Sequence, residues 1–145
     1  MPSDPYNLTR FVQAQENAYP TALRELQNGQ KRSHWMWFIF PQIQGLGISP
    51  TAQYYAVRGL EEARAYLAHP MLGPRLSECT AMVNSLEGRS VTQIFGYPDH
   101  LKFRSSMTLF ELAAGPDAAF SKALDKYYSG ERDQATLDIA RASGR

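Results

Sequence analysis

Residues 98–115 read PDHLKFRSSMTLFELAAG and hold the clearest helical pattern in the chain. Phe103, Met107 and Phe110 recur at intervals of three or four residues, and Ala114 extends the same face. The proline at the start suits the first turn of a helix, and the glycine at the end suits the position just after the last turn. The pattern therefore predicts one long helix with an apolar face.

Similar patterns predict helices through most of the remaining chain. Each combines apolar residues at helical spacing with a capping residue, a proline or a glycine at its ends. The expected helices are a first one capped by Asn7 and carrying Leu8, Phe11 and Val12; a second that begins near Pro20 and ends at Asn28-Gly29; one after Ser49-Pro50; one with Leu60, Ala63 and Leu67 that stops at His69-Pro70; one with Leu76, Cys79, Val83 and Leu86 closed by Gly88; a short one opened by a Ser90–Gln93 capping box; one with Phe120, Leu124 and Tyr128 ended by Gly130; and a last one from Asp133 to about Ala142. The break after the long helix falls at Gly115-Pro116-Asp117, and the tail Ser143-Gly144-Arg145 is expected to be loose.

The segment from Trp35 to Phe40 is apolar throughout, so periodicity cannot separate a helix from a buried strand. A strand would need a partner, and the segment with the most strand character is Gln53 to Val57. We favour a helix for both segments and keep a small two-stranded element as the alternative. The predicted fold class is therefore all-α, or mainly α with that one element.

Length and composition suit one globular unit. The chain has 145 residues, 43% of them apolar and 20% charged, which is enough to bury a sizeable core. The single cysteine, Cys79, cannot form an internal disulfide, which suits a reducing compartment. The first ten residues do not resemble a signal peptide, and no apolar run approaches ~20 residues. We expect a single helical domain over residues 1–145, located in the cytoplasm and without membrane contact.

The region from Lys31 to Gly47 has the most unusual composition. Two tryptophans within three residues cannot easily face one direction on a helix, and a buried indole needs a partner for its N–H. The proline and glycines that follow predict an irregular backbone. We interpret the region as a pocket wall, with aromatic faces for a flat ring and basic residues for phosphate; the alternative is a core helix leading into a structural loop. The candidate ligand-binding residues are Lys31, Arg32, His34, Trp35, Trp37 and Gln42.

A second candidate cluster lies at the start of the long helix. Lys102, Ser105 and Ser106 occur at positions i, i+3 and i+4, which share one helix face. A lysine beside two hydroxyls can hold a phosphate or a carboxylate. The alternative is a solvated face on which Asp99 and Lys102 form an ordinary helical ion pair.

Other chemical signals are weak. The three histidines, His34, His69 and His100, lack the spacing of a metal site, so no metal or other cofactor is expected. Cys79 lies on an apolar stripe and is interpreted as a small core residue. The glycines of Gly45-Leu46-Gly47 are only a fragment of a dinucleotide-binding pattern. No catalytic residue can be named from these patterns.

Three segments carry a family resemblance: residues 31–42, residues 63–70 and residues 102–110. They resemble the bacterial family called domain of unknown function 1810, and within it a mycobacterial conserved hypothetical member. The resemblance covers nearly the whole chain and implies a compact, all-helical domain, without implying an activity. Some members carry the automated name "calpastatin", but an inhibitor of that kind would be expected to be disordered and repetitive.

A more distant resemblance is to the YbiA-like proteins, which are linked to the processing of ADP-ribose derivatives. Phe11-Val12-Gln13-Ala14-Gln15 is similar to a pattern in their early helix. The glutamate expected four residues before Gln13 is replaced here by Thr9, and Glu16 does not occupy the same face. A proposed catalytic acid of that family is therefore missing at this position.

These observations lead to three functional hypotheses. The first is a site for a nucleotide or an ADP-ribose-like ligand, with any chemistry hydrolytic and independent of a metal. The second is a non-enzymatic adaptor that binds another protein through an exposed aromatic patch. The third is single-stranded nucleic-acid binding through aromatic stacking, against which the net charge of +1 argues.

Overall fold

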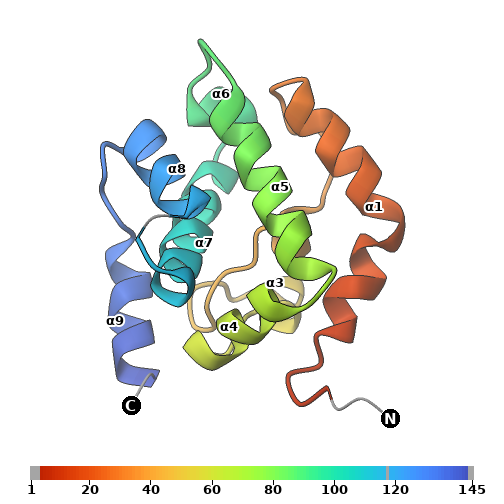
Figure 1. Ribbon diagram of the computed structural model, residues 1–145, viewed down its shortest axis with the longest axis vertical. Helices are drawn as coiled ribbons and strands as arrows, with labels where there is room; N and C mark the ends of the chain where they lie inside the picture. Colours follow the sequence, from red (N-terminus) through yellow and green to blue (C-terminus); the bar gives the residue numbers. More distant parts are fainter. Residues whose placement is uncertain (1–3, 117, 144–145) are drawn as a thin grey trace.

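The computed structural model describes residues 4–116 and 118–143, and within them the fold is all-α. The helices are α1 (Thr9–Gln27), α2 (Met36–Ile39), α3 (Pro50–Tyr54), α4 (Leu60–Ala68), α5 (Leu72–Ser85), α6 (Val91–Phe95), α7 (Asp99–Ala114), α8 (Ala119–Tyr128) and α9 (Gln134–Ser143). In Figure 1, α5 crosses the molecule between α1 on one side and α8 on the other, and it packs against both. The predicted fold class is confirmed.

The long helix predicted from residues 98–115 is α7, and it occupies the centre of the fold. It packs against α4, α6, α8 and α9, and every residue from Ser105 to Phe110 is buried. A helix that is surrounded on most sides cannot keep a wide polar face. Of the predicted apolar stripe, Phe103, Met107 and Phe110 are buried, whereas Ala114 at its end is exposed. The buried surface of α7 also includes residues outside this stripe.

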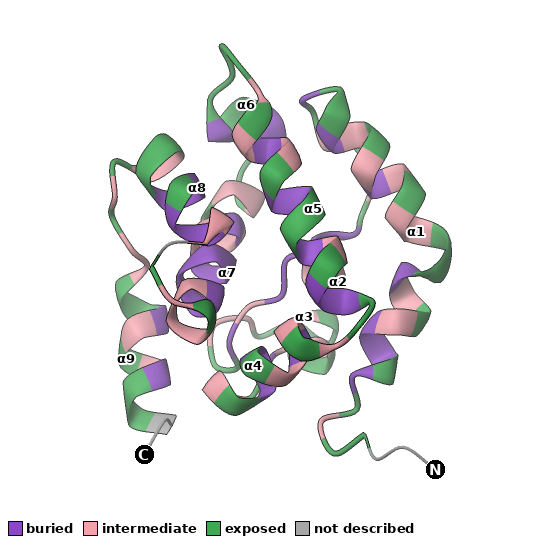
Figure 2. Ribbon diagram, in the orientation of Figure 1, coloured by how far each residue is buried: buried purple, intermediate pink, exposed green. Residues whose placement is uncertain are grey.

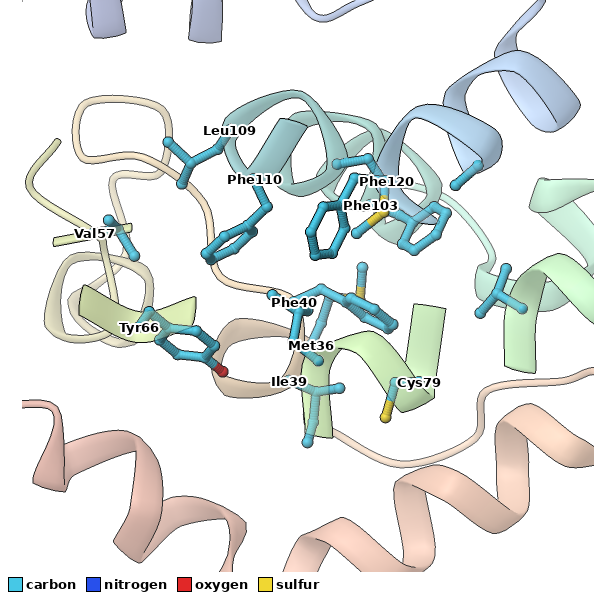
Figure 3. Close-up of a cluster of buried hydrophobic side chains, with 14 of the residues drawn as sticks. Met36, Ile39, Phe40, Val57, Tyr66, Cys79, Phe103, Leu109, Phe110 and Phe120 are labelled. Atoms are coloured by element: carbon cyan, nitrogen blue, oxygen red, sulfur yellow. The ribbon is translucent and has the colours of Figure 1, made fainter. Parts of the chain in front are cut away.

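Aromatic rings fill the space beneath α7. Phe103 and Phe110 point from α7 into the core, where they meet Phe40 and Tyr66 (Figure 3). The Phe40 and Phe103 rings meet edge to face with centroids 4.9 Å apart, and those of Tyr66 and Phe110 are 5.3 Å apart. Such aromatic pairs contribute packing energy beyond the area they bury. Figure 2 shows the resulting layout, with buried residues facing the interior from all of the longer helices.

The segment 35–40 forms only one short helix, α2, before the chain becomes irregular. The favoured helix at 53–57 ends at Tyr54, and Val57 instead forms an isolated parallel bridge with Ile43. The Val57 N–H donates to the Gln42 carbonyl at 2.9 Å, and the Gln44 N–H donates to the Val57 carbonyl at 2.7 Å. The bridge joins Val57 to the loop after α2 and not to residues 35–40, so the alternative of a two-stranded element formed by the two segments is not observed in the described part of the chain.

The two helices predicted before Gly29 are one helix, α1, which continues through Pro20. Its buried residues Phe11, Gln15, Ala22 and Leu26 lie on one stripe that passes Pro20 without a break. Packing of that stripe outweighs the hydrogen bond that the proline removes. The predicted end at Asn28-Gly29 is correct.

The cap predicted for the first helix is wrong. Asn7 adopts a left-handed conformation, with φ of 51°, and its side chain does not cap α1. Asp4 takes this role, because its carboxylate accepts the N–H groups of Leu8 at 2.7 Å and Thr9 at 3.0 Å. An acidic group at this end also suits the helix dipole.

The other helix boundaries follow the predicted signals closely. Ser49 caps α3 with proline in the first turn, and Ser90 and Gln93 form the predicted capping box of α6. The His69 ring accepts the N–H groups of Met71 and Leu72 between α4 and α5. Of the residues placed in the break and the loose tail, Asp117, Gly144 and Arg145 lie outside the described part of the chain. Ser143, also placed in the tail, instead belongs to the last turn of α9.

Candidate functional site

The tryptophan segment is held in place by Glu25, on α1. Its carboxylate accepts hydrogen bonds from the Arg32 N–H, the Ser33 N–H and hydroxyl, and the Trp35 indole, all between 2.5 and 2.9 Å. Burial by itself would raise the pKa of Glu25, but these hydrogen bonds outweigh it and lower the pKa to about 2. At neutral pH an ionised carboxylate therefore anchors residues 32–35 against α1.

The two tryptophans beside this anchor differ in burial. Trp35 is only 1% exposed, and its indole N–H is satisfied by Glu25. Trp37, two residues later, is only partly buried. A ligand ring can reach Trp37 but cannot stack on Trp35, so we remove Trp35 from the candidate site as a correction to the sequence-based prediction.

Lys31, Lys102 and Asp99 form a charged cluster beside these rings. Asp99 binds the Lys31 ammonium at 2.8 Å and the Lys102 ammonium at 3.3 Å. The Lys31 ammonium lies 5.2 Å from the Trp35 ring centre, and the Lys102 ammonium lies 5.2 Å from that of Trp37. One carboxylate shared by two ammonium groups leaves the cluster with a net charge of +1. The two stretches singled out in the sequence, residues 31–47 and 99–108, therefore meet here.

Lys102 also lines a small cavity of about 220 Å³, which we call the Lys102 cavity. It lies between α7, the loop after α2 and the start of α9. Its polar lining is Gln42, Lys102, Ser105 and Asp133, and its apolar lining includes Leu46 and Leu101. This volume is below the usual range for a drug-sized ligand, so the cavity can take one group of a larger molecule.

Trp37, whose ring lies beside the Lys102 ammonium, lines an open groove of about 600 Å³, which we call the Trp37 groove. Its rings come from α2, α3 and the loops beside them: His34, Trp37, Phe38, Tyr54 and Tyr55. Tyr54 is 55% exposed, and its ring meets that of Tyr55 edge to face at 4.8 Å. Exposed aromatic faces of this kind suit stacking with a planar ligand.

The structure brings most of the predicted site residues to this region, in two groups. His34 and Trp37 share the Trp37 groove, whereas Gln42, Lys102 and Ser105 share the Lys102 cavity. Lys31 joins them through Asp99. The contact between Trp37 and Lys102 links the two groups.

Two further predicted residues lie elsewhere. Ser106 is fully buried, and its hydroxyl is a buried atom for which the described residues offer no hydrogen-bond partner. On a helix, positions i+3 and i+4 fall on opposite sides of position i, and the cavity lies on the Ser105 side of Lys102. Arg32 is exposed, its side chain contacts Gln30, and it lines neither space.

Sequence reasoning missed Tyr54, Tyr55 and Asp133. The sequence analysis considered the tyrosines only as part of a segment with strand character. Tyr54 is exposed and Tyr55 is half-buried, and an exposed aromatic beside a second aromatic is a signal of a binding surface. Asp133 was interpreted only as the start of the last helix, a role it does perform. Its Oδ2 atom accepts hydrogen bonds from the Thr136 N–H at 3.1 Å and from the Ser105 hydroxyl at 3.1 Å.

Outside this region the described residues offer few reactive groups. Cys79 is buried in the core, and burial raises the pKa of its thiol to about 12, so the thiol stays protonated. Across residues 4–116 and 118–143, no three His, Cys, Asp or Glu side chains gather in a way that would hold a metal ion. None of the helices in these ranges is long and apolar enough to cross a membrane.

Comparison with known proteins identifies the family. The chain is 52% identical to the conserved hypothetical protein Rv1873 from Mycobacterium tuberculosis, whose crystal structure matches this fold with a TM-score of 0.94. That match covers 95% of this chain and 99% of the other. Among the curated proteins compared, none matches the chain. The family model described as "Protein of unknown function (DUF1810)" matches residues 5–140, and the chain therefore belongs to the DUF1810 family.

Proposed function

We propose that the face around Trp37 binds a small molecule that joins a planar ring to an anionic group, such as a nucleotide or an ADP-ribose derivative. One observation carries the proposal: Trp37 lines an aromatic groove while the ammonium of Lys102 stands 5.2 Å from the same ring. A stacking surface and a cationic centre are therefore neighbours. A ligand that joins a planar ring to an anionic group needs these two features next to each other.

The groove supplies the contacts for the ring. Trp37 and Tyr54 are rigid aromatic side chains that bury a large area with little loss of side-chain freedom. His34, at the edge of the groove, is exposed and can donate or accept a hydrogen bond. The groove volume of about 600 Å³ lies within the range of typical ligand sites.

The charged cluster supplies the contacts for the anion. Lys31 and Lys102 share Asp99, and the Lys102 side chain remains 27% exposed. An incoming phosphate or carboxylate would meet the uncompensated positive charge of this cluster at the partly exposed Lys102 ammonium. The resemblance to YbiA-like proteins is the reason for including ADP-ribose derivatives among the candidate ligands.

Hydrolysis of the ligand remains a prediction. The carboxylate that lines the Lys102 cavity belongs to Asp133, whose Oδ2 accepts hydrogen bonds from Ser105 and from both the N–H and the hydroxyl of Thr136. An oxygen occupied in this way is a poor general base, so only Oδ1 could take a proton. Binding is therefore the function that we propose.

The alternative, a protein-interaction adaptor, also remains a prediction, but it would need different residues. Four of the six side chains from Trp35 to Phe40 are buried, so this segment cannot supply the exposed patch by itself. Leu101, which lines the Lys102 cavity, is exposed, and so are Ile48 and Tyr97, which adjoin its lining residues Gly47 and Pro98 in sequence. An adaptor would have to act through residues of this kind.

A thermal-shift titration tests the binding proposal. ADP-ribose, NAD and mononucleotides are added up to millimolar concentration, because a ligand that binds only the folded state raises the melting temperature with its concentration. We expect a shift in the wild-type protein that is largely lost in Trp37→Leu and in Lys102→Gln. Lys122→Gln is the matched control, since Lys122 is an exposed lysine on α8 that lines neither space. No shift in the wild type, or equal shifts in all four proteins, would contradict the proposal.

A further inference from the structure

A third hollow opens beside the Trp37 groove, and Tyr54 lines both. Its volume is about 320 Å³, and we call it the Arg58 pocket. Its polar lining consists of two guanidinium groups, three side-chain amides and the Tyr54 phenol, from Asn7, Arg10, Gln44, Gln53, Tyr54 and Arg58. Among the described residues, no carboxylate lines this pocket, and Ala56 completes its lining. The composition favours a strongly polar, anionic occupant.

Arg10 is the fixed cation of this pocket. Its side chain is only 6% exposed and forms an ion pair with Glu62 at 2.8 Å. The same guanidinium donates to the backbone carbonyls of Tyr6, Asn7 and Ala56. Arg10 therefore holds the pocket wall in place, and Glu62 compensates its charge.

Arg58 is the available cation. Its side chain is exposed and forms no ion pair or hydrogen bond with the described residues. Its backbone N–H donates to the Glu62 carboxylate at 3.0 Å, which positions the residue at the pocket. With Arg10 and Glu62 cancelling each other, the pocket keeps a net charge of +1 from Arg58. A guanidinium can bind two oxygens of one phosphate or carboxylate at once.

The amides complete the set of groups that an oxyanion needs. The Gln53 side-chain N–H₂ donates to the Ile48 carbonyl at 2.8 Å, so this amide is already oriented. The side-chain amides of Asn7 and Gln44 form no hydrogen bond with described residues and are free to donate. Together with Arg58 they offer several N–H donors around one space.

We infer that the Arg58 pocket is a second oxyanion subsite, for a phosphate monoester or a carboxylate, on the same face as the Trp37 groove. This inference rests on the proposed function where it joins the two spaces through Tyr54. It predicts that ligands with a second anionic group, in addition to the one near Lys102, bind more tightly than ligands with one. The Arg58 pocket thus selects doubly anionic molecules.

The first arm of the test uses inorganic phosphate alone. Backbone amide resonances are followed by NMR at low ionic strength, where screening is weak. We expect saturable shifts at Asn7, Gln44 and Arg58 that disappear in Arg58→Gln and persist in Arg58→Lys. Arg64→Gln is the matched control, because Arg64 is an exposed arginine on α4 that does not line the pocket.

The second arm compares adenosine 5′-monophosphate with adenosine 3′,5′-bisphosphate. We expect the bisphosphate to bind about five- to tenfold more tightly to the wild type, as one charge-assisted contact at a partly exposed site would give. Arg58→Gln should abolish this advantage, whereas Arg64→Gln should keep it.

The two arms separate the two proposals. If the monophosphate binds but phosphate leaves the pocket resonances unchanged and the bisphosphate has no advantage, the second subsite is refuted and the groove proposal stands. If neither nucleotide binds but phosphate shifts the pocket resonances in an Arg58-dependent manner, the subsite stands and the proposed function fails.

Discussion

Glu25 connects α1 to the segment that carries the exposed tryptophan. Its carboxylate accepts four hydrogen bonds from residues 32–35, including one from the Trp35 indole. This arrangement buries one indole and leaves the other at the surface two residues later. The orientation of Trp37 thus depends on a residue that lies on a different helix.

The Glu25 anchor predicts a specific dependence of stability on pH. The folded-state pKa of about 2 lies below the ordinary value of 4.5, so the stabilisation from Glu25 is complete above about pH 4.5. It is lost as the pH falls toward 2. At pH 7 we expect Glu25→Gln to lower the free energy of unfolding by about 2 kcal/mol, because hydrogen bonds to a charged acceptor are the stronger ones.

Urea unfolding at pH 7, 4 and 3 measures this effect. The difference between wild type and Glu25→Gln should shrink as the pH falls. Glu16→Gln, at an exposed position on the same helix, should change the free energy of unfolding by no more than about 0.5 kcal/mol at each pH. An undiminished difference at pH 3 would show that ionised Glu25 is not the anchor.

The different orientations of the two tryptophans could be predicted from the sequence, but the identity of the buried one could not. Two tryptophans at i and i+2 were expected to face different directions, and they do. Which of them is buried could not be predicted, because the choice depends on Glu25, ten residues earlier and on another helix.

Among the elements, α9 depends on a single capping side chain. Asp133 precedes α9, and its Oδ2 accepts hydrogen bonds from the Thr136 N–H and from the Ser105 hydroxyl on α7. The cap therefore also docks α9 onto α7 at the Lys102 cavity. Loss of the cap should loosen both the start of the helix and one wall of this cavity.

We expect Asp133→Ala to lower the free energy of unfolding by about 1–2 kcal/mol, as the loss of a helix N-cap usually does. Amide hydrogen exchange in α9 should accelerate more than exchange in α5. Asp138→Ala is the control, because Asp138 is exposed on the same helix and bonds only the Gln134 side chain. Equal exchange in α9 of the two variants would contradict a capping role.

Helix positions were largely predictable from local signals, and the errors have physical reasons. Capping residues, prolines and glycines affect the backbone of adjacent residues. The ends of α3, α4 and α6 could therefore be predicted from a few neighbouring residues. Pro20 misled the prediction, because the proline signal is local whereas the packing of α1 is not. The bridge between Ile43 and Val57 was not predicted, because it too depends on a contact between segments that are distant in sequence.

At the scale of the whole molecule, Arg10 and Glu62 join α1 to α4 through a buried ion pair. Glu62 is 1% exposed, although carboxylates on helices are usually at the surface. Removing one partner of such a pair leaves an uncompensated buried charge, which typically costs 3–5 kcal/mol. Arg10 of this pair also lines the Arg58 pocket.

We therefore expect Glu62→Gln to lower the free energy of unfolding by about 3 kcal/mol or more. The adjacent residue provides the control. Glu61 is exposed, and among the described residues its side chain accepts a hydrogen bond from the Tyr6 hydroxyl alone, so Glu61→Gln should cost about 0.5 kcal/mol or less. Urea unfolding at pH 7 measures both. Similar costs for the two variants would mean that the buried pair is not a main tie between α1 and α4.

The assembly of the candidate site belongs to this largest scale, and it was the hardest part to predict. The residue types near Trp37 and Lys102 could be selected from composition and spacing. Their meeting at Asp99, and the contribution of Tyr54, depend on contacts between segments far apart in the chain. The Arg58 pocket was not predicted, because its arginines are separated in sequence and carry no motif.

The central claim is that Trp37, and not Trp35, meets a ligand at this face. The chain has two tryptophans, so its NMR spectrum contains two indole N–H signals, which Trp37→Phe assigns. On titration with ADP-ribose we predict a saturable shift of the Trp37 signal, while the Trp35 signal, bonded to Glu25, stays in place. If the Trp37 signal does not move at millimolar ligand, or moves only together with that of Trp35, the account is contradicted.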